Sequence, residues 1–181
     1  MEAAQYGELE TLLSALNSGA DIKCKDYKGD SALHLAAEGG HDTIVKTLVD
    51  RGLDVNTRGD YNWTPLMYAA VVGHEDTVNI LISAGADITC KDDDGENALH
   101  WAARNGHDTI VKILVDQGLN VNSRGEFDRT PLMLAAIEGH KHTFNILIRA
   151  GADSMCKDDQ GNNALDLLTS DDDDSSDDDD C

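Results

Sequence analysis

Residues 64–73 read Thr-Pro-Leu-Met-Tyr-Ala-Ala-Val-Val-Gly, and residues 130–139 read Thr-Pro-Leu-Met-Leu-Ala-Ala-Ile-Glu-Gly. Related segments occur between and on both sides of these two, at intervals of 33 residues. Five small polar residues mark this frame: Ser31, Thr64, Asn97, Thr130 and Asn163. A period of this length predicts supersecondary units that stack on their neighbours. Because stacked units present an extended surface, the sequence favours binding over catalysis.

The local sequence of one repeat predicts two short helices joined by a turn. The residues of the polar frame are good N-caps, and Pro65 and Pro131 follow at the first helical position, where proline is tolerated. Gly40 permits a sharp turn after the first helix. The apolar residues of segment 41–50 then fall on one helical face. An extended hairpin is expected to lead from this second helix to the next unit.

The segments Thr64-Pro-Leu-Met-Tyr-Ala-Ala, Gly73-His74 and Ala84-Gly-Ala-Asp closely resemble ankyrin repeats, and the resemblance covers residues 1 to about 168. It implies an all-α repeat fold, an ankyrin solenoid of stacked helix-turn-helix units with connecting β-hairpin loops. It also implies protein binding, with no intrinsic catalysis and no cofactor. The chain departs from the family where Met67 and Met133 replace the usual His, and where Asn62 and Asp128 replace the usual hairpin Gly.

The repeat frame predicts the division of the chain. We expect an ankyrin domain over residues 1–168, followed by an acidic tail over residues 169–181. The domain divides into an N-terminal capping unit 1–25, the repeats 26–58, 59–91, 92–124 and 125–157, and a partial unit 158–168. The tail carries eight Asp between positions 171 and 180 and no apolar residue there, which predicts disorder. The Met1 start and the tail favour a complete small protein.

The repeats alternate in sequence. Repeat 26–58 matches 92–124 at 22 of 33 positions, and repeat 59–91 matches 125–157 at 20 of 33. Duplication of a two-repeat unit explains this pattern. The duplication either presents similar patches twice, about 20 Å apart at ordinary helix spacing, or has no functional consequence.

The net charge of −21 constrains the partner. Such a field repels phosphate backbones, so no nucleic-acid binding is expected. It would attract a basic protein, although solubility alone also accounts for it. The chain has no apolar run of membrane-spanning length. Cys24, Cys90 and Cys156 are too far apart to pair and suit a reducing compartment, the cytoplasm or nucleus. We expect a monomer.

Partner recognition is expected where the frame allows variation, at the hairpin tips and after the first helix of each repeat. The hairpin positions are Tyr27, Lys28, Asp30, Asp60, Tyr61, Trp63, Asp93, Asp94, Glu96, Glu126, Phe127 and Arg129. The positions after the helices are Val71, Val72, Arg104, Asn105, Ile137 and Glu138. Tip aromatics interleaved with carboxylates suit a segment rich in Lys and Arg. By contrast, Tyr68 and Trp101 are expected in the core.

Other candidate chemistry is limited. Six of the seven His recur on repeat frames and are expected to form backbone and inter-repeat hydrogen bonds, so no catalytic or metal site is predicted. The family resemblance makes Asn56 and Asn122 candidates for hydroxylation, although Asn also suits a turn. Ser175 and Ser176 resemble sites of acidic-directed kinases, since each has Asp three residues later.

Two functions follow from these observations. The first is a non-catalytic adaptor, scaffold or inhibitor that binds a basic protein on its concave face. The alternative is the regulatory ankyrin domain of a larger enzyme, channel or transcription factor.

Overall fold

The computed structural model describes residues 1–168. Its helices are α1 (Glu2–Gln5), α2 (Leu9–Asn17), α3 (Ala32–Glu38), α4 (Asp42–Asp50), α5 (Pro65–Val72), α6 (Glu75–Ser83), α7 (Ala98–Arg104), α8 (Asp108–Asp116), α9 (Pro131–Ile137), α10 (Lys141–Arg149) and α11 (Ala164–Leu168). Two short 3-10 turns, η1 (Asp60–Asn62) and η2 (Glu126–Asp128), lie in the loops before α5 and α9. The expected helical fold is confirmed.

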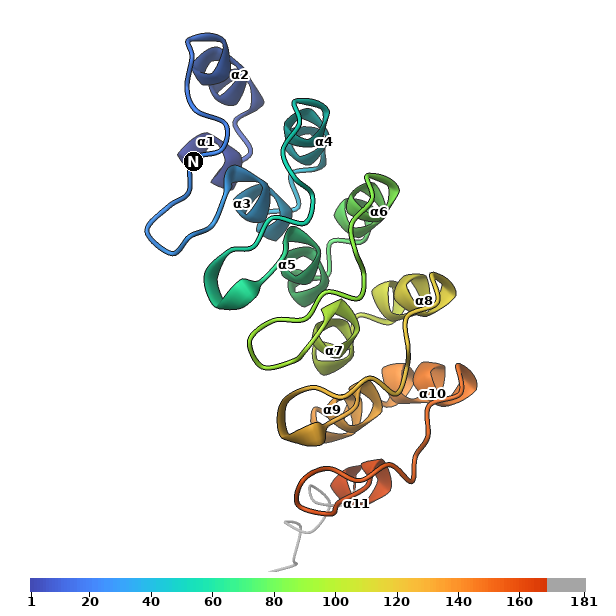
Figure 1. Cartoon of the computed structure of the whole chain (residues 1–181). Helices are drawn as coiled ribbons and strands as arrows, with labels where there is room; N and C mark the ends of the chain where they lie inside the picture. Colours follow the sequence, from blue (N-terminus) through green and yellow to red (C-terminus); the bar gives the residue numbers. More distant parts are fainter. Residues whose placement is uncertain (169–181) are drawn as a thin grey trace, which may run out of the picture.

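The helices form two layers that run the length of a curved stack (Figure 1). The odd-numbered helices α1 to α11 make the inner layer, and the even-numbered helices α2 to α10 make the outer layer. Loops project from the inner layer in a row along the concave side of the stack. Neighbouring helices of the inner layer pack directly on one another, as α3 does on α5 and α7 does on α9.

The recurring small polar residues cap the N-termini of the inner helices, as expected. Thr64 Oγ1 accepts a hydrogen bond from the backbone N–H of Met67 at 3.3 Å, and Asn97 Oδ1 accepts from Leu99 at 3.1 Å. Ser31 and Asn97 also contact the histidine three residues later. The Ser31 hydroxyl lies 2.9 Å from Nδ1 of His34, and Asn97 Oδ1 lies 2.8 Å from Nδ1 of His100. Each of these ring nitrogens accepts the backbone N–H of the capping residue. The expected caps are therefore present.

A continuous aliphatic core lies between the two layers. Leu33, Leu66 and Leu99 fill it from the inner helices, and Ile44 and Leu81 fill it from the outer helices. The paired alanines of the inner helices are fully buried, which lets successive helices approach closely: Ala36, Ala37, Ala69, Ala70, Ala102 and Ala103. Because each unit buries its apolar face against the next, stability depends on the stack as a whole.

The recurring histidines join neighbouring repeats. Nε2 of four of them lies 2.9–3.0 Å from a backbone carbonyl 36 residues earlier in the chain. The pairs are His41 with Gln5, His74 with Glu38, His107 with Val71 and His140 with Arg104. This confirms the structural role expected for these residues.

The sequence alternation corresponds to two kinds of repeat. In the first kind, the imidazole Nε2 lies 3.1 Å from carbonyls of the loop that leads to the next inner helix. His34 contacts Thr57 and Trp63 in this way, and His100 contacts Ser123. In the second kind, Met67 and Met133 take the same place, and their sulfur accepts only the local backbone N–H of Thr64 or Thr130. We call these His-type and Met-type repeats.

The hairpin that follows each His-type repeat begins with a glycine whose backbone lies close to side chains of that repeat. A Cβ atom on Gly59 would lie 3.1 Å from Nε2 of His34, and one on Gly125 would lie 3.1 Å from Nε2 of His100. The His-type repeats carry Asp26 and Asp92 at the corresponding frame position. The same Cβ atoms would lie even closer to an acidic side chain of the preceding hairpin, Asp30 at Gly59 and Glu96 at Gly125. Glycine at the start of the Met-type hairpins therefore makes room for that acidic side chain and for the imidazole.

Three further expectations concern the acidic tail, the cysteines and membrane-spanning helices. The tail 169–181, including Ser175 and Ser176, lies outside the described residues. Among residues 1–168 the three cysteines, Cys24, Cys90 and Cys156, are free thiols. Within the same range, none of the helices has the length and apolar character that crossing a bilayer requires.

Candidate protein-binding surface

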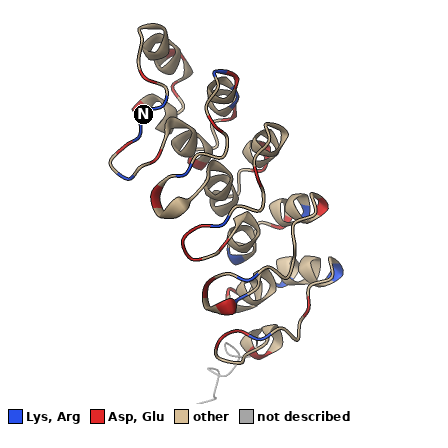
Figure 2. Cartoon of the chain, in the orientation of Figure 1, with Lys and Arg blue, Asp and Glu red and all other residues tan. Residues whose placement is uncertain are grey.

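Five hairpins form the concave edge of the stack, and we call them the hairpin row. They are hairpin 1 (residues 26–30), hairpin 2 (59–63), hairpin 3 (92–96), hairpin 4 (125–129) and hairpin 5 (158–162). In each, the backbone N–H of the first residue donates to the carbonyl of the fifth at 2.9 Å. Figure 2 shows that acidic residues gather on these loops. Acidic side chains thus recur along the row, whose first and fourth hairpins also carry Lys28 and Arg129.

Four basic side chains tie the hairpin row together, and we call them the cation ladder: Lys25, Arg58, Lys91 and Arg124. Each donates to the backbone carbonyl of the residue 33 positions later, as Lys25 does to Arg58 at 2.7 Å and Lys91 does to Arg124 at 2.6 Å. Arg58 also holds its own hairpin, through the carbonyl of Asn62 at 2.7 Å. This ladder was not predicted from the sequence, although basic residues recur there at the same position of successive repeats, 33 residues apart.

Hairpins 2 and 4 have a backbone that the other three lack. Tyr61 and Asn62 have φ of 49° and 60°, and Phe127 and Asp128 have φ of 53° and 56°. With both central residues left-handed, these are type I′ turns, which ordinarily select Asn and Gly. In hairpins 1, 3 and 5, by contrast, the left-handed residue is a glycine. The replacements at Asn62 and Asp128 thus accompany a change of turn type.

An aromatic cluster lies beside hairpin 2, on the inner helices. The Trp63 ring lies 5.0 Å from the Tyr68 ring and 4.6 Å from the Trp101 ring, measured between centroids. The Tyr68 hydroxyl donates to Asp30 Oδ2 at 2.9 Å, and the Trp101 indole N–H donates to Asp92 Oδ2 at 3.0 Å. Burial, followed by the hydrogen bond to Asp30, raises the pKa of Tyr68. Rings and carboxylates therefore hold one another in place.

This cluster corrects two expectations about aromatic residues. Tyr68 and Trp101 were expected in the core. Both are half-buried, because their polar atoms reach carboxylates of the hairpins, although Tyr68 does pack against the core. Trp63 was expected at an open tip but is half-buried between those two rings. Its neighbours on the tips, Tyr27 and Tyr61, are 92% and 67% exposed as expected.

Two acidic residues predicted for partner contact are instead buried, and their side chains are occupied within the fold. Asp30 binds Tyr68 and the backbone N–H of Asp60, the latter at 3.3 Å. Glu96 forms an ion pair with Arg104 at 2.8 Å. Burial raises the pKa of Glu96 to about 7, with the charge of Arg104 acting in the opposite direction. Arg104 in turn lies over the Trp101 ring, 4.6 Å from its centroid.

The remaining predicted residues lie at the surface. The exposed ones are Lys28, Val72, Asp93, Asp94, Asn105, Phe127 and Glu138. The half-buried ones are Asp60, Val71, Arg104, Glu126, Arg129 and Ile137. The hairpin members fall on one row, and the others follow the inner helices at their C-terminal ends. The hairpin members therefore belong to the loops that line the concave side of the stack in Figure 1, and the others to the helices of the inner layer.

At the end of the row, one ion pair is incompletely bonded. Arg129 Nε lies 3.9 Å from Asp158 Oδ2, and each of these buried atoms lacks a hydrogen-bond partner among the described residues. In the preceding His-type repeat, Trp101 donates to the corresponding Asp92 oxygen. Leu167 stands at the position of Trp101 in the last unit and offers no side-chain donor.

The structure changes what we expect of Trp63. Replacing Trp63 with Ala should destabilise the fold by about 1–3 kcal/mol, because it removes two ring contacts and half-buried apolar area. Tyr27→Ala is the matched control: its ring is 92% exposed, so its loss should leave stability nearly unchanged. Urea unfolding of both variants measures the difference. Equal midpoints for Trp63→Ala and the wild type would contradict this account of the cluster.

Asn56 and Asn122, the modification candidates, each form a hydrogen bond between neighbouring repeats. Asn56 Oδ1 accepts the backbone N–H of Asp87 at 2.7 Å, and Asn122 Oδ1 accepts that of Asp153 at 2.8 Å. Each side chain thereby links its own repeat to the loop of the next. This accounts for asparagine at both positions without a modification.

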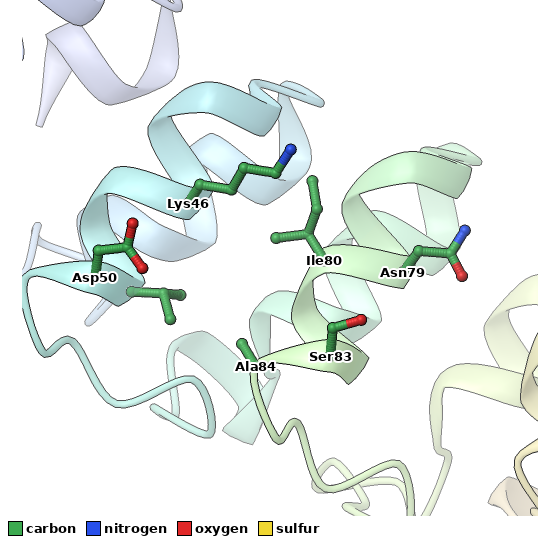
Figure 3. Close-up of a pocket in the computed structure, with 7 residues that line it drawn as sticks. Lys46, Asp50, Asn79, Ile80, Ser83 and Ala84 are labelled. Carbon is green, nitrogen blue, oxygen red and sulfur yellow. The ribbon is translucent and has the colours of Figure 1, made fainter.

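A groove also lies on the outer layer, between α4 and α6. It has a volume of about 440 Å³ and is lined by Lys46, Val49, Asp50, Asn79, Ile80, Ser83 and Ala84. Figure 3 shows Ile80 pointing toward α4, with Asn79 directed away from the groove. None of the residues predicted for partner contact lines it. The groove is therefore separate from the hairpin row.

Comparison with known proteins identifies the repeat. A family model described as ankyrin repeats in three copies matches residues 1–92 and 84–158. The chain is 44% identical over 59 residues to an L-asparaginase of Dirofilaria immitis, covering 33% of this chain and 10% of that protein. It is 44% identical over 55 residues to ankyrin repeat domain-containing protein 29 of Danio rerio, covering 30% and 18% respectively.

A third relative is named as an inhibitor. The NF-kappa-B inhibitor cactus of Drosophila yakuba is 44% identical to this chain over 46 residues, covering 25% of the chain and 9% of that protein. In each of these three relatives, the match spans less than a fifth of the relative's length.

Proposed function

The chain belongs to the ankyrin-repeat family, whose repeats form protein–protein interaction modules, and from that premise we propose that it binds a basic partner along its hairpin row. Binding would be non-catalytic, as in an adaptor, a scaffold or an inhibitor. The relative named as an NF-kappa-B inhibitor supports the last of these roles. We also propose that the protein acts as a monomer in the cytoplasm or nucleus, which agrees with its free thiols.

The observation that carries this proposal is the distribution of charge on the hairpins. The cation ladder directs its four basic groups at backbone carbonyls, so they hold the loops together. The exposed tips retain Asp93, Asp94, Asp128 and Asp159. Acids at the tips of the row, with the four basic groups bonded to backbone carbonyls rather than to these acids, give the tips a negative field, and such a field speeds encounter with a basic surface.

A charge variant tests the proposal. Proteins captured from a cell lysate by the full chain are identified by mass spectrometry, and association of a captured partner is then measured at low and high salt. Asp93→Asn with Asp94→Asn should slow association on the order of tenfold at low salt, and less at high salt.

The control removes the same charge from the outer layer. Asp50 and Asp116 are exposed at the ends of α4 and α8, so Asp50→Asn with Asp116→Asn should leave the association rate nearly unchanged. An equal loss in both double variants would show that net charge, and not the hairpin row, governs binding.

The second candidate function is a regulatory domain attached to another activity. The observation that favours it is the short span of the matches, such as the 10% of the L-asparaginase. Within that relative, the similar segment is a small part of a protein named for its enzymatic activity. Under this reading, the hairpin row would bind a basic surface on a linked enzyme, channel or transcription factor.

A further inference from the structure

One unusual backbone geometry occurs twice in the hairpin row, 66 residues apart. Tyr61 and Phe127 occupy the first central position of the two type I′ turns, with φ of 49° and 53°. A bulky residue is a genuine outlier in this region, so the backbone of both turns is strained. The strain would be smaller with Asn and absent with Gly, the residues that the turn type favours.

Packing within the described residues compensates little for this strain. The Tyr61 side chain is 67% exposed and that of Phe127 is 49% exposed. Phe127 has a cation–π contact with Arg129, whose guanidinium carbon lies 5.2 Å from the ring centroid. Two exposed aromatics in the same strained conformation are therefore better explained by a function outside the fold than by stability.

The two tips are also held rigidly and in equivalent ways. The carbonyl of Tyr61 accepts the backbone N–H of Asp93 at 3.1 Å, and that of Phe127 accepts the backbone N–H of Asp159 at 3.0 Å. Arg58 and Arg124 brace the residue that follows each aromatic, through the carbonyls of Asn62 and Asp128. Preorganised aromatic groups contribute most to binding, because little freedom remains to be lost.

Hairpin 3 stands between the two aromatic tips and is acidic. Its exposed residues Asp93 and Asp94 occupy the tip, and the Asp93 side chain accepts a hydrogen bond from Nδ2 of Asn62 on hairpin 2. The order along the row is thus aromatic, acidic, aromatic. Successive repeats stand about 10 Å apart, so the acidic tip lies about midway in a span of about 20 Å.

We propose that hairpins 2, 3 and 4 form a three-point site for one extended segment of a protein partner. In the extended polyproline II conformation, with about 3.1 Å and one third of a turn per residue, such a segment places three side chains on one face: an apolar side chain at position i, Lys or Arg at i+3, and a second apolar side chain at i+6. The apolar groups contact Tyr61 and Phe127, and the basic group faces Asp93 and Asp94. This inference rests on the proposed function and specifies its partner segment.

The test is selection of random 12-residue peptides displayed on phage, with the immobilised full chain as target. The counter-target carries Tyr61→Asn and Phe127→Asn, which suit a type I′ turn. Enriched peptides should carry the apolar–basic–apolar pattern, and their synthetic forms should bind the wild type at least tenfold more tightly than the double variant. The melting temperature of the double variant should be equal to or higher than that of the wild type, so unfolding would not explain the loss.

Two further variants separate the possible outcomes. Tyr6→Ala removes an exposed aromatic from outside the hairpin row and should leave peptide affinity unchanged. If selected basic peptides depend on Asp93 and Asp94 but bind the aromatic double variant equally well, the three-point site is wrong while the proposed function stands. If the selection yields no peptides that prefer the wild type, or yields peptides without basic residues, both are overturned.

Discussion

Replacing Gly106 with Ala should be among the most destabilising single changes in this protein, at about 3 kcal/mol or more. The residue has φ of 70°, so any Cβ is strained by about 1–2 kcal/mol. That Cβ would also lie 2.7 Å from Nδ1 of His140. The imidazole would have to move, and its Nε2 would lose the Arg104 carbonyl now 3.0 Å away.

The chain supplies a control for this prediction at the same frame position. Gly139 also has φ of 70°, but a Cβ there would meet no other described atom within 4 Å. Gly139→Ala should therefore cost only the backbone strain, about 1–2 kcal/mol. Urea unfolding of both variants gives the comparison. Equal losses would mean that His140 adjusts without cost and that the inter-repeat hydrogen bond contributes little.

His100 and Glu96 should contribute to the change in stability between pH 7 and pH 5 with opposite signs, beside His34, whose pKa burial also lowers. Burial lowers the pKa of His100 to about 4 in the folded state, from an unfolded value of 6.5. As the pH falls, the unfolded state therefore takes up the proton first, and this residue destabilises the fold by about 2 kcal/mol at pH 5.

Glu96 acts in the opposite direction. Its folded pKa of about 7 lies above the unfolded value of 4.5, so the folded state takes up the proton first as the pH falls. Its contribution to stability should rise by about 2 kcal/mol from pH 7 to pH 5. The wild type should thus show little net change from this pair.

Single substitutions at the two sites should expose the opposing slopes. His100→Met imitates the Met-type repeats, and it should make the protein relatively more stable at pH 5 than at pH 7, compared with the wild type. Glu96→Gln should have the reverse effect. Chemical unfolding of the three proteins at both pH values measures this. Parallel pH profiles for all three would show that neither group titrates between these limits.

Most of the fold could be predicted from sequence because the 33-residue period leaves few alternatives. The caps at Thr64 and Asn97 and the inter-repeat histidines follow from local chemistry that is repeated in register. One copy of such a pattern would be weak evidence. Several copies at constant spacing specify both the unit and the way in which the units stack.

The surface could be predicted only in part, because its side chains choose between solvent and a neighbouring hairpin. Glu96 looked like a free tip acid, but the fold pairs it with Arg104 from the following helix. Trp63 looked like an open anchor, but Tyr68 and Trp101 lie beside it. Such contacts join residues from different elements, and the repeat frame does not specify them.

The close approach at Gly59 and Gly125 constrains how a chain of this kind can change in length. A His-type repeat must be followed by a repeat that begins its hairpin with Gly, and in this chain only Met-type repeats do so. Losing a single Met-type repeat would set Asp against both the acidic side chain and the imidazole of the preceding unit. Removal or insertion of 66 residues preserves every kind of junction already present. The pair of repeats is therefore the unit that can be gained or lost without creating a new kind of junction, and natural variants should differ in size by whole pairs.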